Sequence, residues 1–450
     1  MSSEWLNTFR ERGPEPAIFE NDAVLSYSGL ADSITATVEE LSKQGIGPHS
    51  VVVLNSDFSC TGISALFALI HLRAIIIPVV NMTSSAIDTV RQECGAEFLC
   101  RYAPGLIVER LGDGSAPPPL YDALRKRNAS GLVLLSSGST GKPKAILHDL
   151  DHLVDARMGK TGKRRLSIIL FLLFDHIGGI NTLLNSLFSG GAAIVVPERT
   201  PEAVCKLIAR HRANVLPASP TFLNLLLMGR FHEQADLSSL RLISYGTEPM
   251  PEELLRRLRD AFSKVRLLQT FGTSETGIAS TASESSRSTF FKIEGGDVSY
   301  RIVEGELQLK STTQFLGYLN YQADSVTEDG WFRTGDLAEE TANGYIRILG
   351  RSKEIINVGG EKVLPVEVES LLLQSPKIAD CVVYGEKNAI TGQIVCADIV
   401  PREKLTKAEL RQHLFEFLSG RVDRFKIPTR INIVEEVARS DRFKRRRTSQ

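Results

Sequence analysis

The stretch Ser136-Ser-Gly-Ser-Thr-Gly-Lys-Pro-Lys-Ala145 follows the short apolar run Leu132–Leu135, and together they predict a strand that ends in a loop. The loop is made of glycines, hydroxyls and lysines, which present backbone N–H groups and cations to phosphate oxygens. It is not a Walker loop, because two residues separate Gly138 from Gly141 where a Walker loop has about four. The sequence therefore predicts a phosphate-binding loop outside the P-loop NTPase pattern.

Apolar, β-branched runs alternate with helical stretches through most of the chain, as in the run 74–80 and the stretch 201–213. This alternation is typical of α/β proteins. After Gly350 the pattern changes to hairpins, short strands and two helices, which predicts a compact α+β unit. We expect a large, multi-layered α/β domain over residues 1–350 and a small, mobile α+β lid domain over residues 351–450.

Composition narrows the class of protein. In 450 residues, 53 Lys and Arg balance 53 Asp and Glu, which argues against a dedicated nucleic-acid binder. The longest apolar run, Ile168–Phe174, is far shorter than the ~20 residues that span a bilayer, so we expect no transmembrane segment. The start of the chain lacks a secretory-signal pattern, and the six cysteines form no Cys-x-x-Cys pair. We therefore expect a cytoplasmic protein.

Five motifs occur in one order along essentially the whole chain: Ser137-Gly-Ser-Thr-Gly-Lys-Pro-Lys144, Tyr245-Gly-Thr-Glu-Pro249, Thr270-Phe-Gly-Thr-Ser-Glu275, Gly330-Trp-Phe-Arg-Thr-Gly-Asp336, and Gly350-Arg-Ser-Lys353 continuing to Gly360-Glu-Lys-Val-Leu-Pro-Val-Glu367. The set resembles the acyl-adenylate-forming superfamily of acyl- and aryl-CoA synthetases, peptide-synthetase adenylation domains and luciferases. It is most similar to the acyl- or aryl-CoA ligases. Ala145 and Ser274 depart from the glycine and threonine that are usual in the family.

The resemblance implies that ATP, Mg²⁺ and a carboxylic acid bind to this chain. The loop would close on the β- and γ-phosphates with Ser139 and Thr140 as hydroxyl donors, and Glu275 would bind Mg²⁺. Phe271 would offer an aromatic face to the adenine. The nucleotide-binding residues implied in this way are Ser137, Gly138, Ser139, Thr140, Gly141, Lys144, Gly246, Thr247, Glu248, Pro249, Thr270, Phe271, Gly272, Thr273, Ser274, Asp336 and Arg351.

The resemblance also assigns residues near the predicted domain boundary. Asp336 would accept hydrogen bonds from both ribose hydroxyls, and Arg351 would reach the same sugar. Lys353 stands where the family places the hinge of the small domain. Gly359 and Gly360 would lie on a hairpin that approaches the pantetheine of coenzyme A or of a carrier protein, since glycine permits close approach of a backbone.

The segment Leu173-Phe-Asp-His-Ile-Gly-Gly179 resembles the family's Phe-His-x-x-Gly segment. In this register His176 gates the acyl site and orients the carboxylate. A shift of one residue would instead make Asp175 a receptor for an amino group, as in amino-acid-activating domains. The position of Gly179 favours His176.

His148 and His152 flank two carboxylates at a spacing of four residues, which could place two metal ligands on one face of a helix. No third ligand is clustered with them. The start of a helix with acidic residues in its first turn is the favoured interpretation.

The segment Ala438-Arg-Ser-Asp-Arg-Phe-Lys444 keeps the Arg and the Lys of the family's final Pro-Arg-Thr-x-x-Gly-Lys motif but loses its Pro, Thr and Gly. Lys444 is therefore the candidate catalytic lysine. Residues 439–447 contain six basic residues and one acidic residue. We interpret this run as a solvated tail, with a small patch for nucleic acid or anionic membrane as the alternative.

The sequence as a whole predicts an ATP-dependent acid–thiol ligase that forms an acyl-AMP and transfers the acyl group to coenzyme A, with Lys444, His176 and Glu275 as catalytic residues. One alternative is an enzyme that loads an acyl or amino acid onto the phosphopantetheine of a carrier protein. Another is a catalytically idle nucleotide-binding homologue. The motifs do not identify the acid.

Overall fold

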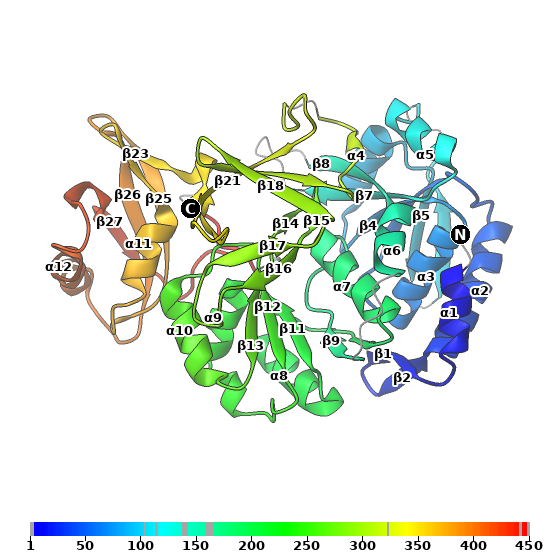
Figure 1. Cartoon of the computed structure of the whole chain (residues 1–450), viewed down its shortest axis with the longest axis horizontal. Coiled ribbons are helices and arrows are strands. Elements are labelled where there is room, and N and C mark those ends of the chain that lie inside the picture. Colours follow the sequence, from blue (N-terminus) through cyan, green and yellow to red (C-terminus); the bar gives the residue numbers. More distant parts are fainter. Residues whose placement is uncertain are drawn as a thin grey trace.

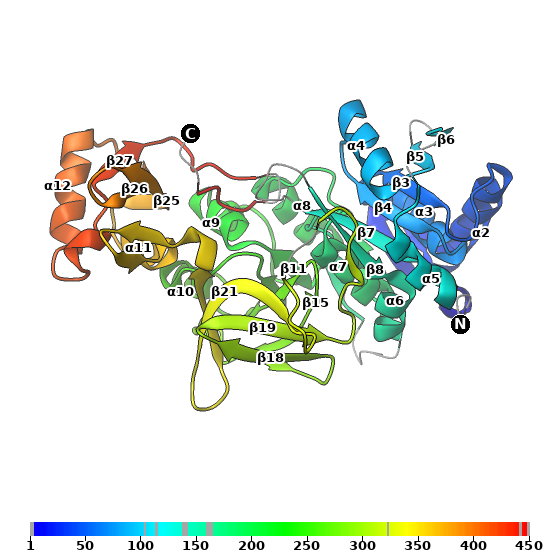
Figure 2. The same cartoon turned by 90° about the horizontal axis from the view of Figure 1, so that it is seen from above.

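The computed structural model describes residues 4–102, 105–112, 116–136, 143–158, 165–321, 324–440 and 443–447. They form a large α/β body and a smaller α+β unit at one end of it (Figure 1 and Figure 2). This arrangement confirms the predicted fold class. Within the described residues no helix is long and apolar enough to cross a membrane.

One seven-stranded sheet carries the predicted phosphate loop. Its strands are β3 (Val51–Asn55), β4 (Ile75–Val79), β5 (Phe98–Tyr102), β6 (Leu106–Arg110), β7 (Gly131–Ser136), β8 (Lys144–Asp149) and β20 (Gly317–Tyr318). Their spatial order is β20-β8-β7-β4-β3-β5-β6, and β5, β3, β4 and β7 run parallel. The predicted strand at Leu132–Leu135 lies in β7, and residues 137–142 of the predicted loop lie outside the described residues.

A second seven-stranded sheet carries the predicted adenine-binding stretches. It contains β1 (Pro16–Glu20), β2 (Ala23–Ser26), β9 (Ser167–Ile169), β10 (Ala192–Ile194), β11 (Val215–Ala218), β12 (Leu242–Tyr245) and β13 (Arg266–Gln269). Strands β11, β12 and β13 are parallel neighbours, so the segments that follow them meet at one edge of the sheet. Ligands of open α/β sheets bind beyond the carboxyl ends of such strands.

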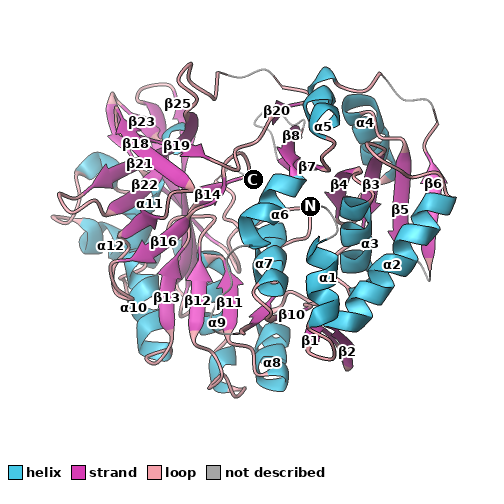
Figure 3. Cartoon of the chain, turned by 45° about the vertical axis from the view of Figure 1, so that its right-hand side comes forward, coloured by secondary structure: helices cyan, strands magenta, loops and turns pink. Residues whose placement is uncertain are grey.

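Twelve helices are assigned within the described residues. They are α1 (Glu4–Glu11), α2 (Tyr27–Lys43), α3 (Cys60–His71), α4 (Ser84–Cys94), α5 (Asp122–Arg127), α6 (Leu150–Met158), α7 (Ile177–Phe188), α8 (Pro201–His211), α9 (Pro220–Met228), α10 (Glu252–Ala261), α11 (Pro365–Leu372) and α12 (Lys407–Leu418). Helix α7 stands between the two large sheets (Figure 3). Its buried leucines join one core with residues of α3 and of the first sheet, which fixes the helix against that sheet.

A third, antiparallel sheet connects the large body to the small unit. It contains β16 (Ser280–Ser283), β17 (Phe291–Glu294), β18 (Val298–Val303), β19 (Glu306–Ser311), β21 (Phe332–Glu340) and β22 (Ile346–Arg351), and the hairpin of β14 (Gly272–Thr273) and β15 (Gly277–Ile278) precedes it. Asp336 pairs with Arg351 across β21 and β22. Strand β22 therefore ends at Arg351, while the division of domains after Gly350 remains a prediction.

The small unit is built on a five-stranded sheet with its own core. Its strands are β23 (Ile356–Val358), β24 (Glu361–Val363), β25 (Ile378–Asn388), β26 (Gly392–Pro401) and β27 (Arg430–Ile433). Helix α12 begins with a capping box, in which the Thr406 hydroxyl accepts from the Glu409 backbone N–H and the Glu409 carboxylate accepts from the Thr406 backbone N–H. Its buried leucines pack with β25 and β26 in the core of this unit.

Replacing Gly179 in α7 tests how tightly this helix is held. A Cβ at this position would lie 2.0 Å from the backbone oxygen of Leu173, so we expect Gly179→Ala to destabilise the fold by about 1–3 kcal/mol. At Gly178 an added Cβ would meet first the flexible side chain of Leu172, and Gly178→Ala is the milder control. Chemical unfolding measures both variants, and equal losses of stability would contradict the close packing at Gly179.

Candidate active site

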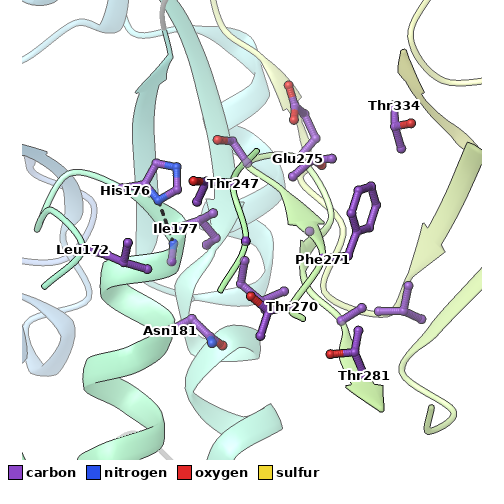
Figure 4. Close-up of a pocket in the computed structure, with 18 of the residues that line it drawn as sticks. Leu172, His176, Ile177, Asn181, Thr247, Thr270, Phe271, Glu275, Thr281 and Thr334 are labelled. Carbon is purple, nitrogen blue, oxygen red and sulfur yellow. Dashed lines mark hydrogen bonds between the residues drawn. The ribbon is translucent and has the colours of Figure 1, made fainter. Parts of the chain in front are cut away.

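A cavity of about 1290 Å³ lies where α7, the segments after β11–β13, the β14–β15 hairpin and the C-terminal segment meet. Figure 4 shows His176, Thr247, Phe271 and Glu275 around it. Lys444 lines the same cavity from the C-terminal end of the chain. The structure therefore brings together His176 and Lys444, which lie 268 positions apart in the sequence.

The end of the predicted phosphate loop contacts two tyrosines. Residues Ser137, Gly138, Ser139, Thr140 and Gly141 lie outside the described residues. The Lys144 ammonium is 3.8 Å from the ring centroid of Tyr321 and 5.3 Å from that of Tyr318. Cation–π contacts of this kind hold the charge of Lys144 at the cavity, which it lines.

Glu275 lies in the turn of the β14–β15 hairpin with its carboxylate at the cavity. Tyr318 donates a hydrogen bond of 2.8 Å to Glu275 Oε1. Among the described residues no group of three His, Cys, Asp or Glu could hold a metal ion. A single carboxylate near the predicted phosphate loop nevertheless fits Mg²⁺, which takes one or two protein carboxylates together with phosphate oxygens and water.

His148 supports this hairpin from β8. Its Nε2 lies 2.7 Å from the carbonyl oxygen of Ser274 and donates to it. Burial lowers the pKa of His148 to about 4, so the imidazole is neutral near pH 7. The favoured interpretation of this segment, a helix start with acidic residues, is confirmed, because α6 begins at Leu150 with Asp151 in its first turn. His148 precedes the helix and lies in β8.

The predicted adenine-binding stretch divides into two parts. Gly246 and Thr247 line the cavity, whereas Glu248 and Pro249 are not among its lining residues. A Cβ at Gly246 would lie 2.6 Å from the backbone oxygen of Thr270, so this position requires glycine. Thr247 has φ 73°, and a non-glycine residue in this region costs of order 1–3 kcal/mol and is typical of functional sites.

The second predicted nucleotide-binding stretch follows β13, and all of it reaches the cavity, from Thr270 and Phe271 through Gly272 and Thr273 to Ser274. The Phe271 ring packs on that of Phe291, with centroids 5.9 Å apart and planes at 28°. Its position is therefore fixed by the core of the third sheet. One face of the ring is packed in this way, and the residue still lines the cavity.

Asp336 and Arg351 form an ion pair of 3.1 Å beside the cavity. Arg351 lines the cavity, whereas Asp336 is buried behind it and is not among the lining residues. Burial raises the pKa of Asp336, although Arg351 acts in the opposite direction. Lys353 follows in a short 3₁₀ turn, is exposed and also lines the cavity.

His176 is the N-cap residue of α7, and its Nδ1 accepts a hydrogen bond of 3.2 Å from the backbone N–H of Gly178. The ring faces the cavity, as Figure 4 shows. Asp175 is not among the lining residues, which favours the register with His176 at the site. Gly359 and Gly360 lie in the turn between β23 and β24, away from this cavity, with φ of 62° and 96°.

The C-terminal segment 443–447 joins the two parts of the molecule. Phe443 packs between the rings of Phe171 and Phe222, with centroid distances of 5.4 Å to each, and the Ser219 hydroxyl donates to its carbonyl oxygen at 2.8 Å. The backbone N–H of Arg445 donates to Glu248 Oε2 at 3.3 Å. Lys444, between these two anchors, faces the cavity and shares a small recess with His176 and Thr247.

The side chains of the same segment enter the small unit. Arg445 forms ion pairs with Glu369 at 3.2 Å and Asp380 at 2.9 Å, and all three side chains are at most 5% exposed. Arg447 pairs with Glu369 and Glu354, both at 2.9 Å. Although burial opposes ionisation, Arg447 and Arg445 hold the pKa of Glu369 below its ordinary value. The interpretation of this run as a solvated tail was therefore wrong for both arginines.

Sequence reasoning missed Tyr318, the role of His148 and the Arg445 cluster. Their partners stand far away in the sequence, as with Tyr318 and Glu275 or Arg445 and Asp380. No local spacing or charge pattern connects such pairs. Glu248 belongs to the stretch predicted to lie along the adenine, and its carboxylate oxygens accept from the backbone N–H groups of Thr221 and Arg445.

Comparison with known proteins agrees with this architecture. Residues 7–319 match the AMP-binding enzyme family and residues 367–444 match the AMP-binding enzyme C-terminal domain. The chain belongs to the AMP-binding enzyme family. It is 29% identical to the indoleacetate–CoA ligase of Aromatoleum aromaticum, over 97% of this chain and 95% of that protein.

One further relative and one solved structure extend the comparison. The pyochelin synthase PchD of Pseudomonas aeruginosa strain UCBPP-PA14 is 26% identical, over 93% of this chain and 86% of that protein. The crystal structure of the anthranilate CoA ligase AuaEII in complex with anthranoyl-AMP superposes with a TM-score of 0.80, at 19% identity, covering 98% of this chain and 95% of that one. This structural likeness shows the shared fold.

Protonation of His148 should reduce stability in acid. The unfolded imidazole titrates near its ordinary value of 6.5 and the folded one near 4, so the unfolded chain binds more protons between these values. Stability should therefore fall by on the order of 3 kcal/mol as the pH decreases through this window. His148→Gln keeps a donor for Ser274 without titrating. Its unfolding free energy should therefore decrease less than that of wild type between about pH 7 and about pH 4.5. Identical pH profiles of the unfolding free energy would refute this assignment.

Replacing Arg445 tests the ion cluster. Arg445→Met leaves Glu369 and Asp380 buried with one fewer cation, so we expect a loss of about 3–5 kcal/mol in unfolding free energy. Arg446 is exposed, and Arg446→Met should change stability by less than ~0.5 kcal/mol. Denaturant unfolding compares the two variants, and the same stability for both would contradict the cluster.

Proposed function

We propose that this chain is an AMP-forming acid–thiol ligase, which activates a carboxylic acid as an acyl-AMP and transfers the acyl group to coenzyme A. The observation that carries the proposal is that Lys444 lines one cavity together with His176, Thr247 and Glu275. Membership of the AMP-binding enzyme family and the similarity to a CoA ligase support an adenylate-forming enzyme.

The first half-reaction brings a carboxylate to the α-phosphate of ATP, and the two anions repel each other. Lys444 supplies a cation between them, which is needed most as charge shifts in the transition state. Lys144 and the neighbouring loop hold the outer phosphates, and Glu275 would hold Mg²⁺, which would neutralise charge on the phosphate oxygens. His176 orients the carboxylate from the N-terminus of α7.

The nucleotide is held on the other side of the cavity. The adenine lies along Gly246 and Thr247 against Phe271, where the absence of a side chain at Gly246 leaves room for a flat ring. The ribose is held by Arg351 and Asp336, whose ion pair lies beside the cavity. Burial of Asp336 strengthens hydrogen bonds that its carboxylate accepts, because the surrounding dielectric is low.

The second half-reaction requires the small domain to rotate about Lys353 and to bring Gly359 and Gly360 to the thiol. Both glycines have no neighbour within 4 Å of an added Cβ in the present arrangement. This open environment is compatible with a hairpin that meets its ligand only after a rotation. The six cysteines are all unpaired thiols, which suits a reducing cytoplasm.

A carrier-protein phosphopantetheine is the alternative acceptor, and the similarity to PchD keeps it in consideration. Both acceptors present the same thiol. Incubation of the enzyme with ATP, an acid panel and either coenzyme A or a holo carrier protein, followed by mass spectrometry of the thioesters, separates the two. If none of the acids causes pyrophosphate release, the result would favour the catalytically idle homologue.

Removal of the Lys444 charge should separate the half-reactions. In Lys444→Ala, pyrophosphate release should fall by about a hundredfold or more, because a positioned charge at the reacting phosphate is lost. Thioester formation from supplied acyl-AMP should be retained, since the rotated small domain carries Lys444 away in that step. Arg446→Ala is the matched control, with both activities unchanged. Normal adenylation by folded Lys444→Ala would show that this lysine has no such role.

A further inference from the structure

An arginine from α6 also lines this cavity. Arg157 is partly buried, and its Nε and Nη2 both donate to Asn181 Oδ1, at 3.1 and 2.6 Å. The amide thus fixes the plane of the guanidinium against α7. None of the residues assigned to the nucleotide, the metal or the thiol contacts it through a hydrogen bond within the described ranges.

The position of Arg157 along α7 sets its distance from the reacting carboxyl. Asn181 stands five residues after His176, which corresponds to a rise of about 7.5 Å along the helix. Figure 4 shows Asn181 further along α7 than His176, with its side chain on the face of the helix toward the cavity. Arg157, which is hydrogen-bonded to Asn181, therefore lies about that far along α7 from His176, and the cavity continues past it to Asn185.

The wall opposite α7 is largely apolar. Val215 and Pro217 of β11, Leu242 of β12 and Leu268 of β13 line it, as alternate residues of neighbouring strands. An acid that fills this space packs its hydrocarbon body on the sheet. Its far end then meets the one cationic group that α6 supplies.

The guanidinium has hydrogen-bonding capacity beyond Asn181. Arginine carries five N–H donors, and within the part of the chain described here Nη1 has no hydrogen-bond partner. Burial lowers the pKa of Arg157, and Asp297, which also lines the cavity, opposes this effect. A charged group held partly out of water costs free energy unless further acceptors reach it.

We propose that Arg157, held by Asn181, determines acid specificity, and that the preferred acid carries an oxygen acceptor at the end remote from its carboxyl group. This inference rests on the proposed function, because it takes the carboxyl to lie near His176. The acceptor is a hydroxyl, carbonyl or carboxylate oxygen some 7–10 Å from the carboxyl, given the rise along α7. A purely hydrocarbon acid leaves the guanidinium donors unsatisfied.

The test compares acids of matched volume. The pairs are 4-hydroxyphenylacetate with 4-methylphenylacetate, and the corresponding 3-arylpropanoates, with pyrophosphate release at limiting acid as the readout. Wild type should prefer the hydroxy acid by about ten- to a hundredfold in at least one pair, as expected for a hydrogen bond to a charged group. A terminal dicarboxylate of similar length distinguishes an anionic acceptor from a neutral one.

The variants locate the preference. Arg157→Met should reduce the hydroxy-to-methyl ratio to about one or below in that pair without changing KM for ATP, and Asn181→Leu should reduce it less. Arg210→Met, an exposed arginine in α8, is the control and should keep the wild-type ratio. A wild-type preference for the methyl acids, or an unchanged ratio in folded Arg157→Met, overturns the proposal.

Binding separates this proposal from the proposed function. Non-hydrolysable sulfamoyl-adenosine analogues of the same acyl groups are titrated calorimetrically into wild type and Arg157→Met. If no acid releases pyrophosphate, the ligase proposal fails, while a tighter Kd for the hydroxy analogue that disappears in Arg157→Met still supports the acceptor site. Equal affinities of both analogues for wild type count against Arg157 whatever the activity.

Discussion

The ion cluster around Arg445 is the constraint on which the arrangement of the site depends. Its guanidinium is enclosed by Glu369 and Asp380 of the small unit, while its backbone N–H is bound by Glu248 of the large body. Breaking such a pair leaves an uncompensated buried charge, so the segment has few alternative positions. Lys444 is the preceding residue, and the cluster thereby sets where its ammonium can reach.

The large body contacts the C-terminal segment 443–447 through apolar side chains, next to a strained backbone position. Phe443 fills a space between Phe171 and Phe222, and Thr247 is held at positive φ beside the recess that contains Lys444. The Phe443 packing and the Glu248 contact hold the C-terminal segment on the large body, while Arg445 holds the same segment in the small unit. A rotation of that unit would have to break the Glu248 contact, the Phe443 packing or the Arg445 cluster, which couples the position of Lys444 to the conformation of the whole chain.

Much of this could be predicted from sequence where the information is local. The alternation of strands and helices predicted the fold class, and the spacing from Arg439 to Lys444 singled out the lysine that lines the cavity. Pairings between distant segments could not be predicted in this way. Arg445 looks like one more cation in a basic run until Glu369 and Asp380 are seen around it, and no local pattern connects His148 with the carbonyl oxygen of Ser274.

Transfer of oxygen from the acid to AMP tests the central claim most directly. The enzyme is incubated with ATP, Mg²⁺, coenzyme A and an acid labelled with ¹⁸O in both carboxyl oxygens, and the AMP is analysed by mass spectrometry. If an acyl-AMP forms in this cavity, the carboxylate oxygen that attacks the α-phosphate stays on phosphorus when the thiol attacks the carbonyl carbon. The account predicts AMP with one ¹⁸O atom. Thioester formation with unlabelled AMP, or with the label in inorganic phosphate beside ADP, would contradict it.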